Sequence, residues 1–213
     1  MNNLLYKEFN LSITKFFIIM PFLLSALIMI PNWIFTIAFM YFFWISVPNI
    51  FINYNTQNDY LFMSTLPVDK KSIVKAKIQL VVSLEMLHII SAGVFTIIHN
   101  QLYGTYNFFL DLNLAFYGLI SIMFGLFNIT FLPLYFKTTY RIAKPLIVSL
   151  IVTGVYAILI ETLNFVVKPY NEIMEQSNMS VQLSIFIFGI VVFLILTHIS
   201  KLRSTNNFMG VNS

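Results

Sequence analysis

The chain has 213 residues, of which 59% are hydrophobic, 17% aromatic and only 9% charged, with a net charge of +4. So few charged side chains cannot cover a soluble globule, and this length favours one helical bundle without an appended soluble domain. The absence of Cys excludes disulfides and thiolate metal sites.

The chain begins with a segment, residues 1–15, in which apolar side chains recur at helical spacing among charged ones. This pattern predicts an amphipathic helix that lies on the inner membrane surface. The alternative is a plain cytoplasmic extension of the first span. The apolar positions are Leu4, Leu5, Phe9 and Ile13, and the charged ones are Lys7, Glu8 and Lys15.

Six apolar stretches follow, and we interpret each as a transmembrane helix. The first is short: at about 1.5 Å per residue it reaches about 22 Å, less than the hydrocarbon core of about 30 Å. The charges decide its assignment, because the lysines before it and those after the second stretch can share one side only if two crossings separate them. The predicted spans are about 16–30, 33–52, 78–98, 112–136, 145–167 and 181–199.

The basic residues predict the orientation. Of the twelve Lys and Arg residues, all but Lys168 fall at the ends of the chain or in gaps on one side of the predicted bundle. Since short basic loops stay inside, we expect both termini to be cytoplasmic. The fold class is therefore all-α, a single polytopic transmembrane domain over residues 1–213. Topology also accounts for the positive charge, so we expect no nucleic-acid partner. Heavy use of Asn, Ile, Phe and Lys favours a bacterial source, and hence a bacterial plasma membrane.

Residues 53–77 form the longest predicted cytoplasmic connection. Asn58 or Asp59 can cap a short helix there, and Pro67 disfavours helix in the residue before it, so about two turns fit between them. Asp69 or Ser72 can cap the next helix, which runs on into the third span.

The short helix would display Leu61, Phe62 and Leu66 outside the lipid. Apolar groups held exposed on a rigid segment often mark a docking surface. The alternative is that they fold back against the membrane or neighbouring helices, and the pattern does not decide between the two.

At this segment the chain resembles the permeases of type-2 ABC transporters. The resemblance is carried by Leu4-Leu5-Tyr6-Lys7-Glu8-Phe9, by Asn58-Asp59, and by Leu66-Pro67-Val68-Asp69-Lys70-Lys71-Ser72-Ile73-Val74-Lys75-Ala76-Lys77. The layout of an interfacial helix and six spans with both ends inside is also similar. Within the family, the chain looks most similar to small permease subunits of staphylococcal exporters, such as that of the phenol-soluble modulin exporter.

The resemblance implies that residues 53–77 act as a coupling segment that docks on a separate cytosolic ATPase. That ATPase would bind ATP and Mg²⁺, while this chain would hold no cofactor and would not be an enzyme. The resemblance also implies pairing with a second permease, identical or related, within membrane lipid. The implied cargo is an amphipathic or antimicrobial peptide, for export or self-protection. The coupling role falls on Asp59, Tyr60, Leu61, Phe62 and Leu66, with Lys70 and Lys71 nearby.

Motifs of catalysis are absent from the sequence. It contains no Gly-x-x-x-x-Gly-Lys-Ser/Thr loop, no Gly-x-Ser-x-Gly elbow and no His-Glu-x-x-His pair. We therefore expect no catalytic residue and no metal ligand, and an intramembrane enzyme has no identifiable catalytic constellation. If transport is driven by ATP, another polypeptide must bind it.

Glu85, His88 and Glu161 are ionisable residues at membrane depth, which usually face a bundle interior or an aqueous path. The spacing places Glu85 and His88 on one face of the helix, where they can interact directly. They are candidates for the translocation path, or form a hydrogen-bonded contact between helices with Ser83, Ser91 or Tyr117. They also support a rival function, an ATP-independent secondary carrier, although the inverted repeats typical of such carriers are not evident. Glu161 either contacts a cationic substrate or reaches the interface.

Small residues recur on the fourth predicted span at Gly118, Ser121 and Gly125. A stripe of this kind predicts close helix packing, either within the subunit or across a dimer.

Overall fold

The computed structural model describes residues 2–12, 15–59, 62–63, 67–138, 141–174 and 179–211, which are mainly helical. A π-helical segment, Glu8–Ser12, follows α1, a 3₁₀ turn, Ala26–Met29, follows α2, and a second π-helical segment, Phe42–Ser46, joins α3 to α4. The α-helices are α1 (Asn2–Lys7), α2 (Lys15–Ser25), α3 (Phe35–Tyr41), α4 (Val47–Thr56), α6 (Lys70–Tyr103), α7 (Leu114–Lys137), α8 (Ala143–Val166), α9 (Lys168–Met174) and α10 (Met179–Val211).

Five helices of the described chain are long and apolar enough to cross a membrane. This confirms a helical, multi-pass membrane protein. The first predicted span corresponds to a shorter apolar helix, Phe16–Met29, so the count of six spans stays a prediction. The five long helices are Phe35–Thr56, Lys70–Tyr103, Leu114–Lys137, Ala143–Val166 and Met179–Gly210.

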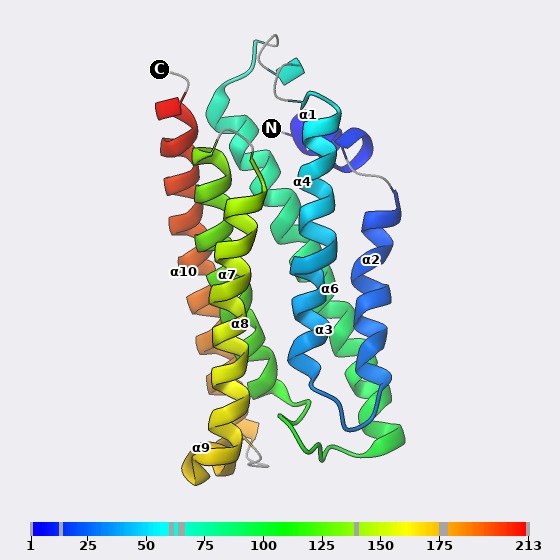
Figure 1. Cartoon of the computed structure of the whole chain (residues 1–213). Helices are drawn as coiled ribbons and strands as arrows, with labels where there is room; N and C mark the ends of the chain where they lie inside the picture. Colours follow the sequence, from blue (N-terminus) through cyan, green and yellow to red (C-terminus); the bar gives the residue numbers. More distant parts are fainter. Residues whose placement is uncertain are drawn as a thin grey trace.

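The bundle has two groups of helices (Figure 1). One contains α7, α8 and α10, and the other contains α2 and the continuous α3–α4 helix. The long helix α6 contacts both α2 and α10 and so belongs to both groups. Both ends of the chain lie at the end of the bundle where α6 begins, while α9 lies at the opposite end (Figure 1). This arrangement agrees with the predicted placement of both termini on one side; the cytoplasmic assignment stays a prediction.

Helix α6 begins where the sequence predicts and continues beyond the predicted end of the span. Asp69 caps its first turn, because the Asp69 carboxylate accepts a hydrogen bond from the Lys71 backbone N–H at 3.2 Å. The helix ends only at Gly104, whose φ of +84° favours glycine. The helix therefore continues five residues past the predicted end of the span at residue 98, since residues 99–103 contain neither glycine nor proline.

Aromatic side chains fill the contact between the α3–α4 helix and α7. Phe43 stacks on Phe127 with ring centroids 4.1 Å apart, and Phe127 stacks on Phe131 at 5.1 Å. Phe51 meets the same column from α4, with its ring 5.0 Å from that of Phe131. Such ring pairs stabilise beyond the burial of their area, so this column holds the two helix groups together.

Helices α7 and α10 make the most extensive contact in the bundle, and glycines allow it. A Cβ placed on Gly118 would lie 2.5 Å from the carbonyl oxygen of Ile185, and one on Gly189 would overlap the backbone of Gly118. Both are shorter than real Cβ contacts, so the backbones touch only because these residues lack side chains. The predicted small-residue stripe thus packs within the subunit.

We expect Gly118→Ala to destabilise the bundle by about 1–3 kcal/mol, because the added methyl group must push α10 away from α7. The matched control is Gly93→Ala on α6, where an added Cβ meets no atom within 4 Å. That change should stabilise by up to about 1 kcal/mol through helix propensity. Unfolding free energies from SDS titration in mixed micelles measure both, and a Gly118→Ala protein as stable as the parent would contradict the close packing.

Candidate functional site

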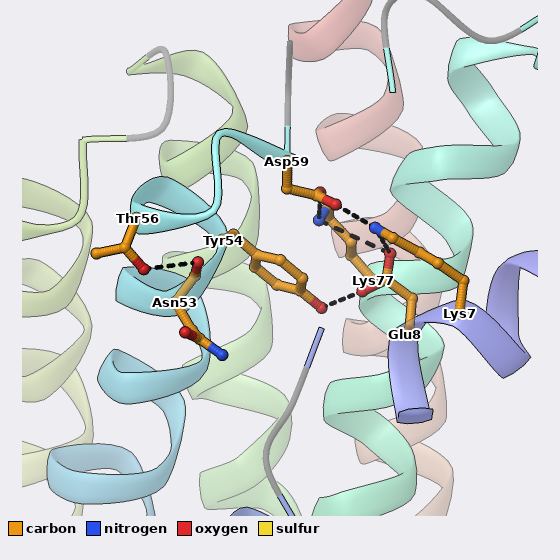
Figure 2. Close-up of polar contacts among 7 residues, drawn as sticks. All are labelled: Lys7, Glu8, Asn53, Tyr54, Thr56, Asp59 and Lys77. Atoms are coloured by element: carbon orange, nitrogen blue, oxygen red, sulfur yellow. Dashed lines mark hydrogen bonds and ion pairs between the residues drawn. The ribbon is translucent and has the colours of Figure 1, made fainter. Parts of the chain in front are cut away.

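A buried group of charged side chains lies at the end of the bundle that holds both termini (Figures 1 and 2). We name it the charge cluster. Its members come from four separate parts of the chain: the N-terminal segment, the end of α4, the residue that starts the predicted coupling helix, and the second turn of α6. They are Lys7, Glu8, Tyr54, Asp59 and Lys77.

Two carboxylates and two ammonium groups pair within the cluster (Figure 2). Asp59 accepts hydrogen bonds from Lys77 Nζ at 2.5 Å and from Lys7 Nζ. Glu8 accepts one from the Tyr54 hydroxyl at 2.5 Å and one from Lys7 Nζ at 3.1 Å. Lys77 Nζ also lies 3.8 Å from Glu8 Oε1. Each carboxylate therefore has at least two polar partners, which joins the four chain segments.

The cluster is shielded from water. Glu8 and Lys77 are 1% exposed and Asp59 is 4% exposed. The ammonium of Lys77 lies 3.1 Å from the centre of the Tyr54 ring, a cation–π contact at a desolvated site. Since two positive and two negative charges balance, each charge is compensated. Removal of any one partner would leave a buried charge unpaired.

The electrostatics favour an ionised Asp59. Burial by itself raises the pKa of this carboxyl group, but the ammonium groups of Lys77 and Lys7 oppose it and together lower the pKa of Asp59 below its usual value. Asp59 therefore stays charged at neutral pH, and the cluster is held by ion pairs rather than by neutral hydrogen bonds.

The local sequence turns Asp59 inward. Helix α4 ends at Thr56, whose hydroxyl donates back to the Asn53 carbonyl oxygen at 3.0 Å (Figure 2). Asn58 then adopts a positive φ of 50°, a conformation that asparagine tolerates better than most residues. This sharp turn reverses the chain and directs the Asp59 side chain towards α6.

The structure separates the residues predicted to couple to an ATPase. Asp59 lies in the charge cluster, whereas Phe62 is 56% exposed and Lys70 and Lys71 are exposed at the start of α6. Tyr60, Leu61 and Leu66 lie outside the described residues. The coupling role of this set stays a prediction.

Sequence reasoning missed most of the cluster. In the sequence, Lys77 stands only as the last residue of the stretch that carries the family resemblance, and Glu8 as a charged residue of the amphipathic N-terminal segment. The one available signal is that Glu8 and Asp59 are acidic residues among the basic residues of the same predicted side. This suggests ion pairing but does not identify the partners.

Glu85 and His88 do not form the direct contact that their helical spacing allows. Glu85 accepts a hydrogen bond from Asn128 of α7 at 2.8 Å, and the His88 ring stacks on Phe39 with centroids 5.0 Å apart. Within the described residues, neither ring nitrogen of His88 has a hydrogen-bond partner. Of the two Glu85 carboxylate oxygens, only the one that accepts from Asn128 has a partner there. The Phe39 ring of α3 and the Phe42 ring of the π-helical segment after it both pack against the imidazole. The interhelical alternative describes Glu85 correctly, with Asn128 as a partner that was not foreseen.

Glu161 is buried at the wall of a groove between α3 and α8, which we name the α3–α8 groove. It accepts hydrogen bonds from the Thr36 hydroxyl at 2.9 Å and from the Leu110 backbone N–H at 3.4 Å. The groove has a volume of about 720 Å³ and a mostly apolar lining. Both Glu161 oxygens thus join α8 to other parts of the bundle. Over the described part of the chain, no three His, Asp or Glu side chains gather where they could hold a metal ion.

Comparison with protein families matches the chain to a family described as ABC-2 family transporter protein, over residues 3–209. Searches of curated proteins and of solved structures found no match. The family match spans the charge cluster and all the long helices. It confirms the sequence-based resemblance at the level of the family, while the closer likeness to staphylococcal exporter subunits stays a prediction.

A double-mutant cycle tests the pairing of Asp59 with Lys77. Asp59→Asn leaves the cluster with one excess positive charge and Lys77→Met leaves one excess negative charge, so each should destabilise by about 3 kcal/mol. The double variant is again neutral, and we expect its loss to be smaller than the sum by about 2 kcal/mol. Unfolding free energies from SDS titration measure all three variants.

The control is Lys70→Met, which removes an exposed lysine seven positions earlier and should change stability by less than about 0.5 kcal/mol. Additive losses in the double variant, or single variants as stable as the control, would contradict a tightly coupled buried pair.

Proposed function

The chain belongs to the ABC-2 family of transporter proteins, and we propose that it is the permease subunit of an exporter that a separate cytosolic ATPase drives through residues 53–77. The family membership gives the class of protein, an ABC transporter membrane subunit. The charge cluster is the observation that supports the mechanism.

The predicted short coupling helix starts at Asp59, and Asp59 is paired with Lys77 on α6. If this short helix moved without α6, both charges would remain buried without partners, at a cost of about 3 kcal/mol or more. Movement of α6 together with Asp59 avoids this cost. Tyr54 at the end of α4 and the N-terminal Lys7 and Glu8 join the same cluster, so a push on the segment reaches several helices at once.

The docking surface is the exposed side of the segment. Phe62 offers an apolar side chain to solvent, and Lys70 and Lys71 add positive charge at the start of α6. Apolar anchors with charges around them are typical of protein interfaces. The ATP and Mg²⁺ would lie on the partner, in keeping with the lack of a phosphate-binding loop in this sequence.

The remaining parts of the proposal rest on the resemblance and on topology. We place the chain in a bacterial plasma membrane with both termini cytoplasmic and with six spans, which are too few for the usual pathway. A second permease, identical or related, would complete it. The cargo would be an amphipathic or antimicrobial peptide, for export or self-protection.

Docking is tested by affinity purification from native membranes in mild detergent, followed by mass spectrometry. We expect a near-stoichiometric ATPase to co-elute with the parent chain and to be reduced at least about tenfold by Phe62→Asp, because a carboxylate replaces an apolar anchor. The matched control is Tyr106→Asp, an equally drastic change at an exposed position on the opposite end of the bundle. Equal recovery of the ATPase with both variants would show that Phe62 is not part of the interface.

Transmission is tested by the charge-neutral Asp59→Asn/Lys77→Met variant. It should fold and retain the ATPase. Export should nevertheless fall by about tenfold or more in membrane vesicles, because no ion pair joins the short coupling helix to α6 any longer. Normal export would show that the cluster serves stability alone. Reproducible recovery of the folded parent chain without any ATPase would favour the secondary carrier instead, and Glu85→Gln and His88→Asn would then be the variants to test for transport.

A further inference from the structure

A second groove lies at the other end of α6, between this helix and the first turns of α7 and α10. We name it the α6–α10 groove, and it has a volume of about 750 Å³. Ile90, Val94 and Ile97 on α6 and Phe186 on α10 form its apolar part. The three α6 side chains are more than half exposed, so this part opens sideways, at a depth where the membrane-spanning helix meets lipid.

The end of the groove near the 104–113 loop is polar and rich in hydrogen-bond acceptors. Asp111 lines it, with one carboxylate oxygen accepting from the Asn107 backbone N–H at 2.7 Å. Asn100 also lines it and donates its amide to the Leu112 carbonyl oxygen at 3.0 Å. The other amide atom, Asn100 Oδ1, is buried and accepts no hydrogen bond from the described residues. An unused buried acceptor calls for a donor.

The charge of the lining is negative. Asp111 is its one charged residue among those the structure describes, and neither Lys nor Arg contributes. Such a site favours a ligand whose cationic group has several N–H donors. It disfavours a ligand that carries a phosphate or carboxylate but no cationic group. The polar and apolar parts are continuous along α6 from Ile89 to Asn100, a distance of about 16 Å. The ligand that fits has an ammonium head and a long apolar tail.

We propose that the α6–α10 groove binds a membrane lipid whose head group carries a primary ammonium, with one acyl chain along α6 and the ammonium between Asp111 and Asn100. The sideways opening of the apolar part supports a bilayer lipid over a solute that enters from water. The proposal does not depend on the exporter function, because it concerns the outer half of α6 and its readout is lipid binding.

Native mass spectrometry of the purified full chain, released from nanodiscs, tests the head group. The nanodiscs contain equal amounts of phosphatidylethanolamine, phosphatidylcholine and phosphatidylglycerol with the same acyl chains. Phosphatidylcholine keeps the positive charge but has no N–H donors. We expect phosphatidylethanolamine to be retained about tenfold more than either of the others, the size expected for one charge-assisted hydrogen bond.

Three variants locate the site. Gly93→Phe should abolish preferential retention, because Gly93 lines the groove and its added side chain meets open space rather than backbone. The matched control, Gly154→Phe, fills the separate α3–α8 groove and should leave retention unchanged. Asp111→Asn keeps an oxygen for the Asn107 N–H but removes the charge, and should lower retention about tenfold.

The proposal is overturned if the three lipids are retained equally, or if Gly93→Phe and Gly154→Phe behave alike. It is also overturned if a single-chain alkylamine is retained by the parent and lost in Gly93→Phe while phosphatidylethanolamine is not retained, since the occupant is then a free amphiphile. Gly93→Ala, which leaves most of the groove open, should retain the lipid, so that loss in Gly93→Phe reflects filling rather than misfolding.

Discussion

A buried ionised group is stable only beside its partner, and this constraint governs the end of the molecule where the chain starts and ends. Lys77 and Asp59 cannot reach water, so the positions of α6 and of the segment after α4 are fixed relative to each other. The N-terminal segment is bound by the same rule through Lys7 and Glu8. Apolar contacts in a bilayer do little to fix the relative positions of helices, because lipid tails are as apolar as leucine.

Elsewhere, the bundle depends on shape rather than charge. The aromatic column from Phe43 to Phe131 joins the α3–α4 helix to α7, and the glycine contact at Gly118 brings α10 against α7. Other helix pairs pack less closely, and the α3–α8 groove and the α6–α10 groove lie between them. Helix α8 reaches α3 at Glu161 while leaving the α3–α8 groove beside it. Close helix contacts therefore alternate with open grooves across the bundle.

The sequence predicts the class of fold because lipid imposes simple rules. The lengths of the five long spans, the Asp69 cap and the Gly118 stripe all depend on local pattern, and each appears in the helices or contacts described. The charge cluster is different, since Lys7 and Asp59 are 52 positions apart and no periodicity relates them. The direct Glu85–His88 contact, which the helical spacing allows, is absent for a related reason. Helical spacing makes a contact available, but the Phe39 ring competes for the imidazole and only the tertiary structure shows it.

Helix α6 connects the charge cluster to the groove at its opposite end, because both include its side chains. Its 34 residues extend about 50 Å, and no proline interrupts them. A continuous helix shifts largely as a unit, so a displacement at Lys77 also alters the spacing between α6 and α10 around Ile90 and Phe186. Linkage then makes the effect reciprocal: a lipid that prefers one spacing must bias the position of the coupling segment by the same free energy. If both proposals hold, the composition of the membrane and the state of the ATPase would act on α6 from its two ends.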